Sequence, residues 1–146
     1  MSTRQTRNEL IAAMFHELRR TVAGTVLFNQ RMATLLKVNP TDLQFLNLLE
    51  LYGPLTPGRL AELSGLTTGG VTVVLNRMEK AGVIRRAPNP GDRRSSIIHA
   101  DEKFLRTARV AYSKRTQATD KLLAGFSDSE LRTVVSFLKK ANDARV

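Results

Sequence analysis

The sequence predicts a mainly α-helical fold of six helices and one small β-hairpin, and two features of the chain carry this prediction. Apolar residues recur every three or four positions through most of the 146 residues, which is the period of an amphipathic helix. Between Val83 and Ala100 this period is lost, and two short, partly β-branched segments flank a stretch that contains proline and glycine. A chain of this length can bury a substantial hydrophobic core.

The first predicted helix spans about residues 8–36 and carries an apolar stripe that must be buried against a sizeable surface. Asn39 and Pro40 end this helix. Thr41 precedes Gln44 by three residues, and this spacing predicts a capping box at the start of a second helix.

Two further helices have clear boundary signals. The threonine-proline pair at 56–57 is typical of an N-cap and a first helical position, so a short helix begins there. Gly65 makes a turn, Thr67 or Thr68 caps the next helix, and Gly82 ends it.

The hairpin is predicted from the segments "VIRRAP" and "SSIIHA", which "NPGDRR" separates. Residues 89–92 fit a type II turn, with proline at the second position and glycine at the third. After the hairpin, Asp101 caps a helix that reaches about Leu123, and Ser127 with Glu130 forms the capping box of the last helix.

The predicted helix that begins near Thr67 has two dissimilar sides. One side is apolar: Val71, Val74, Leu75 and Met78. The other side is small near the amino end and basic near the carboxyl end: Gly69, Thr72, Val73, Asn76, Arg77 and Lys80. A helix that enters the DNA major groove end-on needs this gradient, because small residues meet base edges and cations pass phosphates. The alternative is an amphipathic surface helix whose charged side is merely solvated.

The adjacent glycines of this helix, Gly69 and Gly70, need an explanation, because a glycine inside a helix costs roughly 1 kcal/mol relative to alanine. We interpret them as positions where a bulky partner approaches the backbone. The segment "LAELSGLTTGGVTVVL" has the spacing of a helix-turn-helix, and the hairpin after it carries four arginines. A thin, arginine-bearing ribbon suits the minor groove, so residues 41–100 predict a winged helix-turn-helix. The alternative for the hairpin tip is a solvated turn in which Asp92 pairs with an arginine.

Composition agrees with a polyanionic partner. The net charge is +10 and the isoelectric point about 10.9, which favours nucleic acid or an anionic membrane surface. There is no cysteine, which excludes disulfides and thiolate metal sites. No signal peptide or membrane span is visible, so we expect the cytoplasm.

No residue pattern predicts an enzyme, a cofactor or a metal site. The dipeptide His16-Glu17 begins a zinc-protease motif, but Arg20 stands where the second histidine belongs. No phosphate-binding loop is present, because "GPLTPG" lacks the required lysine, and no Ser/His/Asp set follows from the spacing.

From Thr41 to Arg94 the chain resembles the MarR family of bacterial transcription regulators. The segment "LTPGRLAELSGLTTGGVTVVLNRMEKAGVIRRAPNPGDRRS" follows the recognition helix and wing of that family, including the D-x-R of the wing at Asp92 and Arg94. The resemblance implies a homodimer held by N-terminal (1–36) and C-terminal (101–146) helices, and a small-molecule pocket between those helices and the DNA-binding lobe. Two departures are "ADEKF" in place of "LTEKG", and Gly69, Gly70 and Val73 where members often carry polar or basic residues.

We therefore predict a homodimeric, sequence-specific regulator, a repressor in the simplest case, that binds a pseudo-palindromic operator and is released by a small aromatic or anionic effector. The predicted DNA contacts are Thr67, Thr68, Gly69, Gly70, Thr72, Val73, Asn76, Arg77, Lys80, Arg86, Asp92, Arg93 and Arg94. The predicted effector contacts are Phe15, His16, Arg19 and Phe45, for which ordinary core packing or solvated charge is the competing interpretation. Two other functions stay open, an architectural protein that binds any DNA and a winged module that binds an acidic protein.

Overall fold

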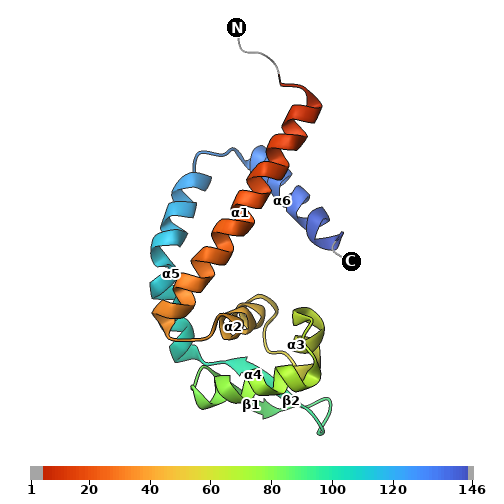
Figure 1. Ribbon diagram of the computed structural model, residues 1–146, viewed down its shortest axis with the longest axis vertical. Helices are drawn as coiled ribbons and strands as arrows, with labels where there is room; N and C mark the ends of the chain where they lie inside the picture. Colours follow the sequence, from red (N-terminus) through yellow and green to blue (C-terminus); the bar gives the residue numbers. More distant parts are fainter. Residues whose placement is uncertain (1–4, 145–146) are drawn as a thin grey trace. The chain divides into compact units, whose positions relative to one another are not determined.

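The computed structural model describes residues 5–144 and shows six helices and one antiparallel hairpin in the predicted order (Figure 1). The helices are α1 (Arg7–Leu36), α2 (Pro40–Tyr52), α3 (Pro57–Ser64), α4 (Thr68–Lys80), α5 (Glu102–Leu123) and α6 (Asp128–Asp143), and the strands are β1 (Ile84–Pro88) and β2 (Ser96–Ala100). The predicted fold class is confirmed. The chain divides within α5 into two units, Met1–Thr107 and Ala108–Val146. The outermost residues of the predicted terminal segments, 1–4 and 145–146, lie outside the described range.

Four predicted helix boundaries are confirmed. The Thr56 hydroxyl accepts a hydrogen bond from the Arg59 N–H at the start of α3, and Ser127 forms a capping box with Glu130 at the start of α6. Gly65 has the left-handed conformation (φ 70°) that ends α3. Gly82 also has a positive φ, of 71°, directly after the last turn of α4.

The predicted capping box at Thr41 is wrong. Asn39 is the N-cap of α2, and its side-chain oxygen accepts from the Thr41 N–H at 3.0 Å. Pro40 occupies the first turn, where its fixed φ suits the helix and its missing N–H leaves no partner unsatisfied. The helix before it ends at Leu36 as predicted, and the residue that caps it is Lys37, which adopts the left-handed conformation.

The tip of the hairpin is not the predicted type II turn. That turn requires a positive φ at its third residue, and Gly91 is not among the positive-φ glycines of the described chain. Two side chains shape the tip instead. The Asn89 Oδ1 accepts from the Gly91 N–H at 3.0 Å, and the Asp92 Oδ1 accepts from the Arg94 N–H at 2.9 Å.

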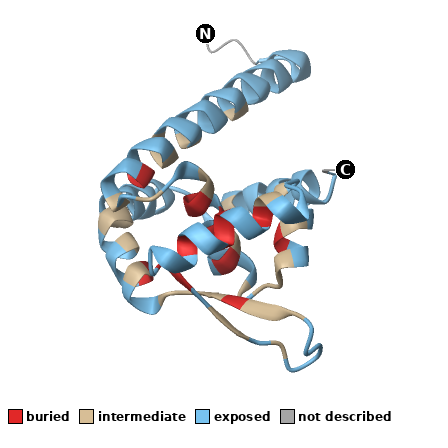
Figure 2. Cartoon of the chain, turned by 60° about the horizontal axis from the view of Figure 1, so that its bottom comes forward, coloured by how far each residue is buried: buried red, intermediate tan, exposed pale blue. Residues whose placement is uncertain are grey.

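The hydrophobic core lies inside the first unit, between α2, α3, α4 and the hairpin (Figure 2). Its buried members are Phe45, Leu46, Leu49, Leu60, Val71, Val74, Leu75, Met78, Val83, Ile84 and Ile98. Strand β2 pairs with β1 on one side, and on the other side Ile98 exchanges two backbone hydrogen bonds with Leu55, at 2.8 and 3.2 Å. We call the segment Pro40–Ala100 the lobe. Helix α1 packs on it through α2, and its buried residues are Met32 and Ala33 near the carboxyl end.

Candidate nucleic-acid interface

Helix α4 is held by its apolar side and presents the other side to solvent. The four predicted inner residues, Val71, Val74, Leu75 and Met78, are all buried. The predicted outer residues Gly69, Thr72, Val73, Asn76, Arg77 and Lys80 are all exposed. The Thr67 hydroxyl caps the helix by accepting from the Gly70 N–H at 3.1 Å. The helical period of the sequence therefore placed both sides of α4 correctly.

The two glycines at the start of α4 differ in their surroundings. A Cβ built on Gly70 would lie 3.3 Å from the Thr67 Oγ1, so part of the reason for Gly70 is the helix cap itself. A Cβ built on Gly69 meets nothing within 4 Å. Nothing inside the described chain therefore requires a glycine at position 69.

Thr72 and Val73 form the exposed middle of the outer side. The Thr72 hydroxyl donates to the Thr68 carbonyl at 2.9 Å, one turn earlier in α4. Its proton is therefore in use, and Thr72 offers a partner its methyl group and acceptor lone pairs. Val73 is 63% exposed and offers only methyl groups, which suit contact with a thymine methyl.

Arg77 belongs to an ion pair that the sequence did not reveal. Its Nε lies 3.1 Å from both carboxylate oxygens of Asp42 on α2, and its Nη2 bonds the same carboxylate. These hydrogen bonds raise the pKa of Arg77 above its ordinary value. The Asp42 side chain is 5% exposed and that of Arg77 43%, so one edge of the guanidinium fastens α4 to α2 while the rest faces solvent. The one available signal was Asp42 itself, an acidic residue one turn before the apolar pair Phe45 and Leu46.

Arg86 of β1 forms a second link, also unforeseen. Its Nε donates to the Glu79 Oε2 at 3.0 Å, and its Nη2 donates to the Asn76 Oδ1 at 2.7 Å. Both partners lie on α4, so Arg86 joins the strand that leads into the wing to the outer side of the helix. Sequence spacing gives no sign of such a contact between a helix and a strand.

The wing tip presents the exposed side chains of Arg93 and Arg94. Within residues 5–144, no carboxylate forms an ion pair with Arg93 or Arg94, and both residues are exposed. The alternative in which Asp92 pairs with an arginine side chain is not seen, since Asp92 accepts from the backbone of Arg94. The tip is further tied by the Asn89 Nδ2, which donates to the Ser95 Oγ at 2.7 Å. Asp92 therefore shapes the turn that displays the two cations.

Comparison with known proteins places the chain in a family. A family model of the MarR family matches residues 36–95, which span α2 to the tip of the wing. A Bacillus subtilis (strain 168) protein described as the uncharacterized HTH-type transcriptional regulator YcgE is 36% identical over 143 residues, 98% of this chain and 93% of that one. The chain belongs to the MarR family. It is accordingly a DNA-binding transcriptional regulator, a class of proteins that are not enzymes.

Solved structures share the fold over nearly the whole chain. A MarR family protein from Bacillus stearothermophilus superposes with a TM-score of 0.67 at 25% identity, covering 94% of this chain and 97% of that one. A mutant of MepR from a multidrug-resistant S. aureus clinical isolate gives a TM-score of 0.68 at 17% identity, covering 97% of this chain and 99% of that one. The six helices and the hairpin are thus the architecture of the MarR family.

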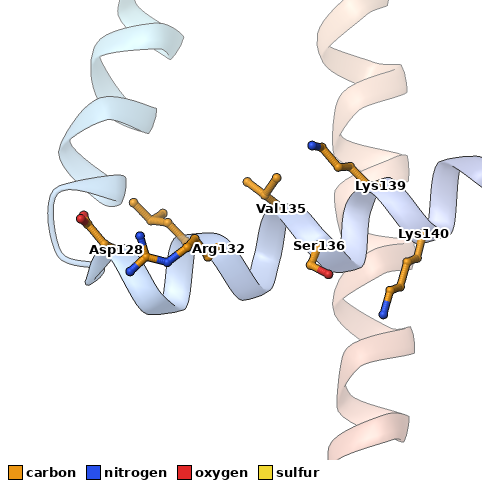
Figure 3. Close-up of a pocket in the computed structure, with 7 residues that line it drawn as sticks. Asp128, Arg132, Val135, Ser136, Lys139 and Lys140 are labelled. Atoms are coloured by element: carbon orange, nitrogen blue, oxygen red, sulfur yellow. The ribbon is translucent and has the colours of Figure 1, made fainter.

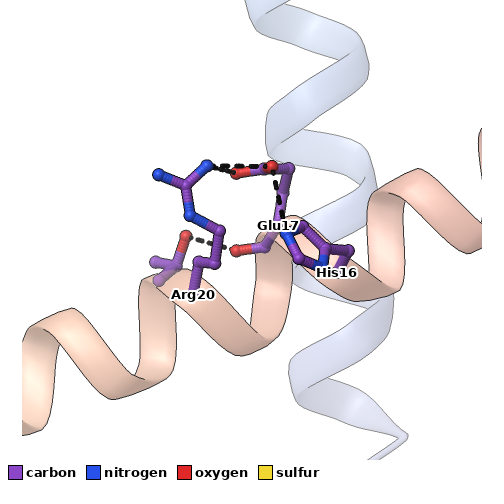
Figure 4. A network of polar contacts seen from close by, with 4 residues as sticks. His16, Glu17 and Arg20 are labelled. Carbon is purple, nitrogen blue, oxygen red and sulfur yellow. Dashed lines mark hydrogen bonds and ion pairs between the residues drawn. The ribbon is translucent and has the colours of Figure 1, made fainter.

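The four predicted effector contacts of this MarR-family chain are not gathered in one place. Phe45 is 1% exposed inside the core of the lobe. Phe15 and Arg19 line a shallow apolar hollow on α1 with Leu18, Val22 and Ala23. His16 lies on the same helix, where its Nε2 is 4.0 Å from the Glu17 Oε1 (Figure 4).

The charges around His16 are those of a solvated helix surface. Figure 4 shows the Arg20 guanidinium against the carboxylate of Glu17, at 3.0 Å, and the side chains of all three residues are more than half exposed. Within the described residues no cluster of histidine or acidic side chains could hold a metal ion. None of the helices in that range is both long and apolar enough to cross a membrane.

Apolar side chains are exposed along the terminal helices. On α1 these include Leu10, Phe15, Val22, Val26 and Leu27, and on α6 they are Val134, Val135, Phe137 and Leu138. A surface hollow on α6 is lined by Leu131 and Val135 together with polar and charged side chains, among them Arg132, Lys139 and Lys140 (Figure 3). Helix α6 has no buried residue at all.

Proposed function

We propose that this regulator binds a pseudo-palindromic operator as a homodimer, acts in the cytoplasm as a repressor, and is released by a small aromatic or anionic effector. The observation that carries the proposal is the pairing of an exposed, small-to-basic side of α4 with a wing tip whose arginines have no acidic partner among the described residues. The first suits a major groove and the second a minor groove.

The proposed contacts fall into two kinds. Thr67, Thr68, Gly69, Gly70, Thr72 and Val73 approach base edges from the amino half of α4, where few groups can read bases by hydrogen bonding. Lys80, Arg93, Arg94 and the open edge of Arg77 meet phosphates or the minor groove. Sequence preference then rests on methyl contacts and DNA shape more than on hydrogen bonds to bases.

The terminal helices support a dimer. Exposed apolar patches larger than a few hundred Å² are uncommon on monomers and typically mark interaction surfaces. The segments 1–36 and 101–146 carry such residues on α1 and α6, while 41–100 carries the DNA-binding elements. In a two-fold dimer the two copies of α4 then lie about 34 Å apart, one turn of DNA.

Selection of genomic fragments by the purified protein tests the proposal. We expect enrichment of an inverted repeat whose half-sites are one helical turn apart, and at least ~1000-fold preference over random duplex. Equal affinity for all fragments would support the architectural alternative. No binding to duplex in dilute buffer would favour the module that binds an acidic protein.

The enriched operator then allows a test of repression and of effector release. We expect a reporter behind that operator to be silenced by the protein and restored by an effector that binds the free and DNA-bound conformations unequally. A panel of small aromatic acids, screened by thermal shift, gives candidates. A reporter that the protein activates, or a compound that stabilises the protein without weakening its DNA binding, would contradict these two parts of the proposal.

A further inference from the structure

Asn76 stands on the exposed outer side of α4, one turn beyond Thr72 and Val73. A free asparagine has two ways to meet a base, because its oxygen accepts and its amino group donates. Both are needed for the paired contact with adenine, in which the oxygen accepts from N6 and the amino group donates to N7.

Arg86 occupies the acceptor oxygen of Asn76, so only the amino group remains to meet a base. Its Nη2 donates to the Asn76 Oδ1 at 2.7 Å while its Nε donates to the Glu79 Oε2 at 3.0 Å. Because a guanidinium only donates, the atom of Asn76 that faces it must be the oxygen. The amino group of Asn76 is therefore turned away from Arg86.

The same contacts occupy Arg86. Its side chain is 30% exposed, and two of its donors are already directed at α4. It also neutralises Glu79, whose carboxylate would repel a phosphate on this side of the helix. The neighbouring Arg85 differs, because alternate residues of a strand point to opposite faces and its side chain is exposed.

We propose that Arg86 is a positioning residue and not a phosphate contact: it holds the Asn76 oxygen, so that Asn76 meets DNA only as a hydrogen-bond donor. The partner of Asn76 is then an acceptor oxygen or nitrogen, either on a base (guanine O6 or N7, thymine O4) or on a phosphate. This inference rests on the proposed insertion of α4 into the major groove.

The decisive variant is Arg86→Lys, which keeps the positive charge but cannot bridge Asn76 and Glu79 with a planar fork. The probes are the duplex that the wild-type protein enriches from a random library and a scrambled duplex, each titrated over a range of salt concentrations. We expect Arg86→Lys to bind the enriched duplex roughly 3- to 10-fold more weakly, as for one lost hydrogen bond. The salt slope is compared between the wild type and the neutral variant Arg86→Ala: we expect it to stay unchanged, whereas loss of a true phosphate contact lowers it by about 0.9.

Three further variants complete the test. Asn76→Ala should weaken binding at least as much as Arg86→Lys, and the double variant should be no weaker than Asn76→Ala alone. Asn76→Asp keeps an acceptor for Arg86 but has no N–H to donate, so it should bind at least as weakly as Asn76→Ala. Arg85→Ala is the charge control, and it should leave the base preference unchanged. Thermal melting of each variant confirms that it is folded.

The outcomes distinguish a failure of the proposed function from a failure of the role of Arg86. If the wild-type protein prefers no duplex, the proposed function fails and the inference with it. If the wild type is selective but Arg86→Lys binds like it, or if Arg86→Lys still weakens the Asn76→Ala protein, only the inference is overturned. In the supporting case, a loss on the enriched duplex alone identifies a base as the acceptor, and an equal loss on the enriched and the scrambled duplex identifies a phosphate.

Discussion

The lobe and the terminal helices place their apolar residues in opposite ways. In the lobe, α4 buries all four of its inner residues, and Leu75 and Met78 have no exposed surface. On α6 the corresponding stripe of Val134, Val135 and Leu138 is between 46% and 49% exposed. Both helices are amphipathic in sequence, so amphipathicity alone does not say whether a helix finds its partner within its own chain.

This difference in burial suggests that the two regions are stabilised in different ways. The lobe completes its core with residues of one chain, which holds α4 by its inner side and leaves its outer side exposed. The terminal helices retain apolar surface that a second copy would cover, so their stability should depend on protein concentration. The variants that follow test this contrast, beginning with the largest expected effect.

Leu75→Ala should strongly destabilise the lobe. Removing a fully buried leucine side chain lowers the free energy of unfolding by about 2–5 kcal/mol. Urea denaturation measures the loss, and Val73→Ala on the exposed side of the same helix is the matched control, with a change within about 0.5 kcal/mol. Similar losses for both variants would show that α4 is not anchored by its inner side.

Arg77→Ala should also destabilise the lobe, because it leaves the buried carboxylate of Asp42 without a partner. Breaking a fully buried pair costs about 3–5 kcal/mol, and the partial exposure of Arg77 reduces our expectation to about 2–3 kcal/mol. In an Asp42→Asn background the same change should cost less. Lys80 is a cation on the outer side that takes no part in the Arg77–Asp42 pair. Lys80→Ala should therefore lower the salt slope of DNA binding and leave the free energy of unfolding nearly unchanged.

Val135→Asp tests the terminal helices. A carboxylate in the middle of an apolar interface should raise the dimer dissociation constant by about 10- to 100-fold, or about 1.4–2.7 kcal/mol. Analytical ultracentrifugation measures the change. Thr133→Asp adds the same charge to the opposite side of α6, and it should leave the dimer intact. Equal dissociation by the two variants would argue against the apolar stripe as the interface.

Gly69→Ala should separate stability from function. Its Cβ would meet nothing within 4 Å among the described residues, so alanine should raise the free energy of unfolding by up to about 1 kcal/mol and at the same time weaken operator binding. Gly70→Ala gains less, because its Cβ presses on the capping Thr67. Denaturation and DNA titration on the same samples measure both quantities. Unchanged operator affinity in Gly69→Ala would remove the case for close approach of DNA at this position.

The smallest effect concerns pH. Hydrogen bonds from Ser127 lower the pKa of Glu130 below its ordinary value, and those from Thr6 do the same for Glu9. Each carboxylate therefore stabilises its helix above about pH 4.3, the ordinary value, and this stabilisation is lost as pH falls through the lowered pKa. Glu130→Gln keeps the acceptor oxygen without the titration, so melting temperatures of the variant should fall less steeply in this acid range. Identical pH profiles would mean that the ionisation of Glu130 contributes nothing measurable to stability.

Local patterns in the sequence were sufficient to predict the helices and the hairpin, and to predict which side of α4 is buried. The period of Val71, Val74, Leu75 and Met78 and the caps at Thr56 and Ser127 depend only on near neighbours, so they could be read directly. The links from Arg77 to Asp42 and from Arg86 to Asn76 could not. They join residues 35 and 10 positions apart through side-chain geometry that the fold creates. Gly69 and Gly70 could not be told apart from the sequence either. Only the structure shows that a Cβ at Gly70 would contact Thr67 whereas one at Gly69 would not.

The exchange of hydrogen bonds between Ile98 and Leu55 has a consequence for how the protein behaves at high concentration. An uncovered strand edge is a template on which other chains can assemble into aggregates. At its centre β2 is closed on both sides, by β1 and by Leu55, which leaves β1 as the open edge. That edge is five residues long, ends in Pro88 and carries Arg85, so it offers a poor template for sheet growth. The wing can therefore project into solvent without inviting intermolecular β-pairing.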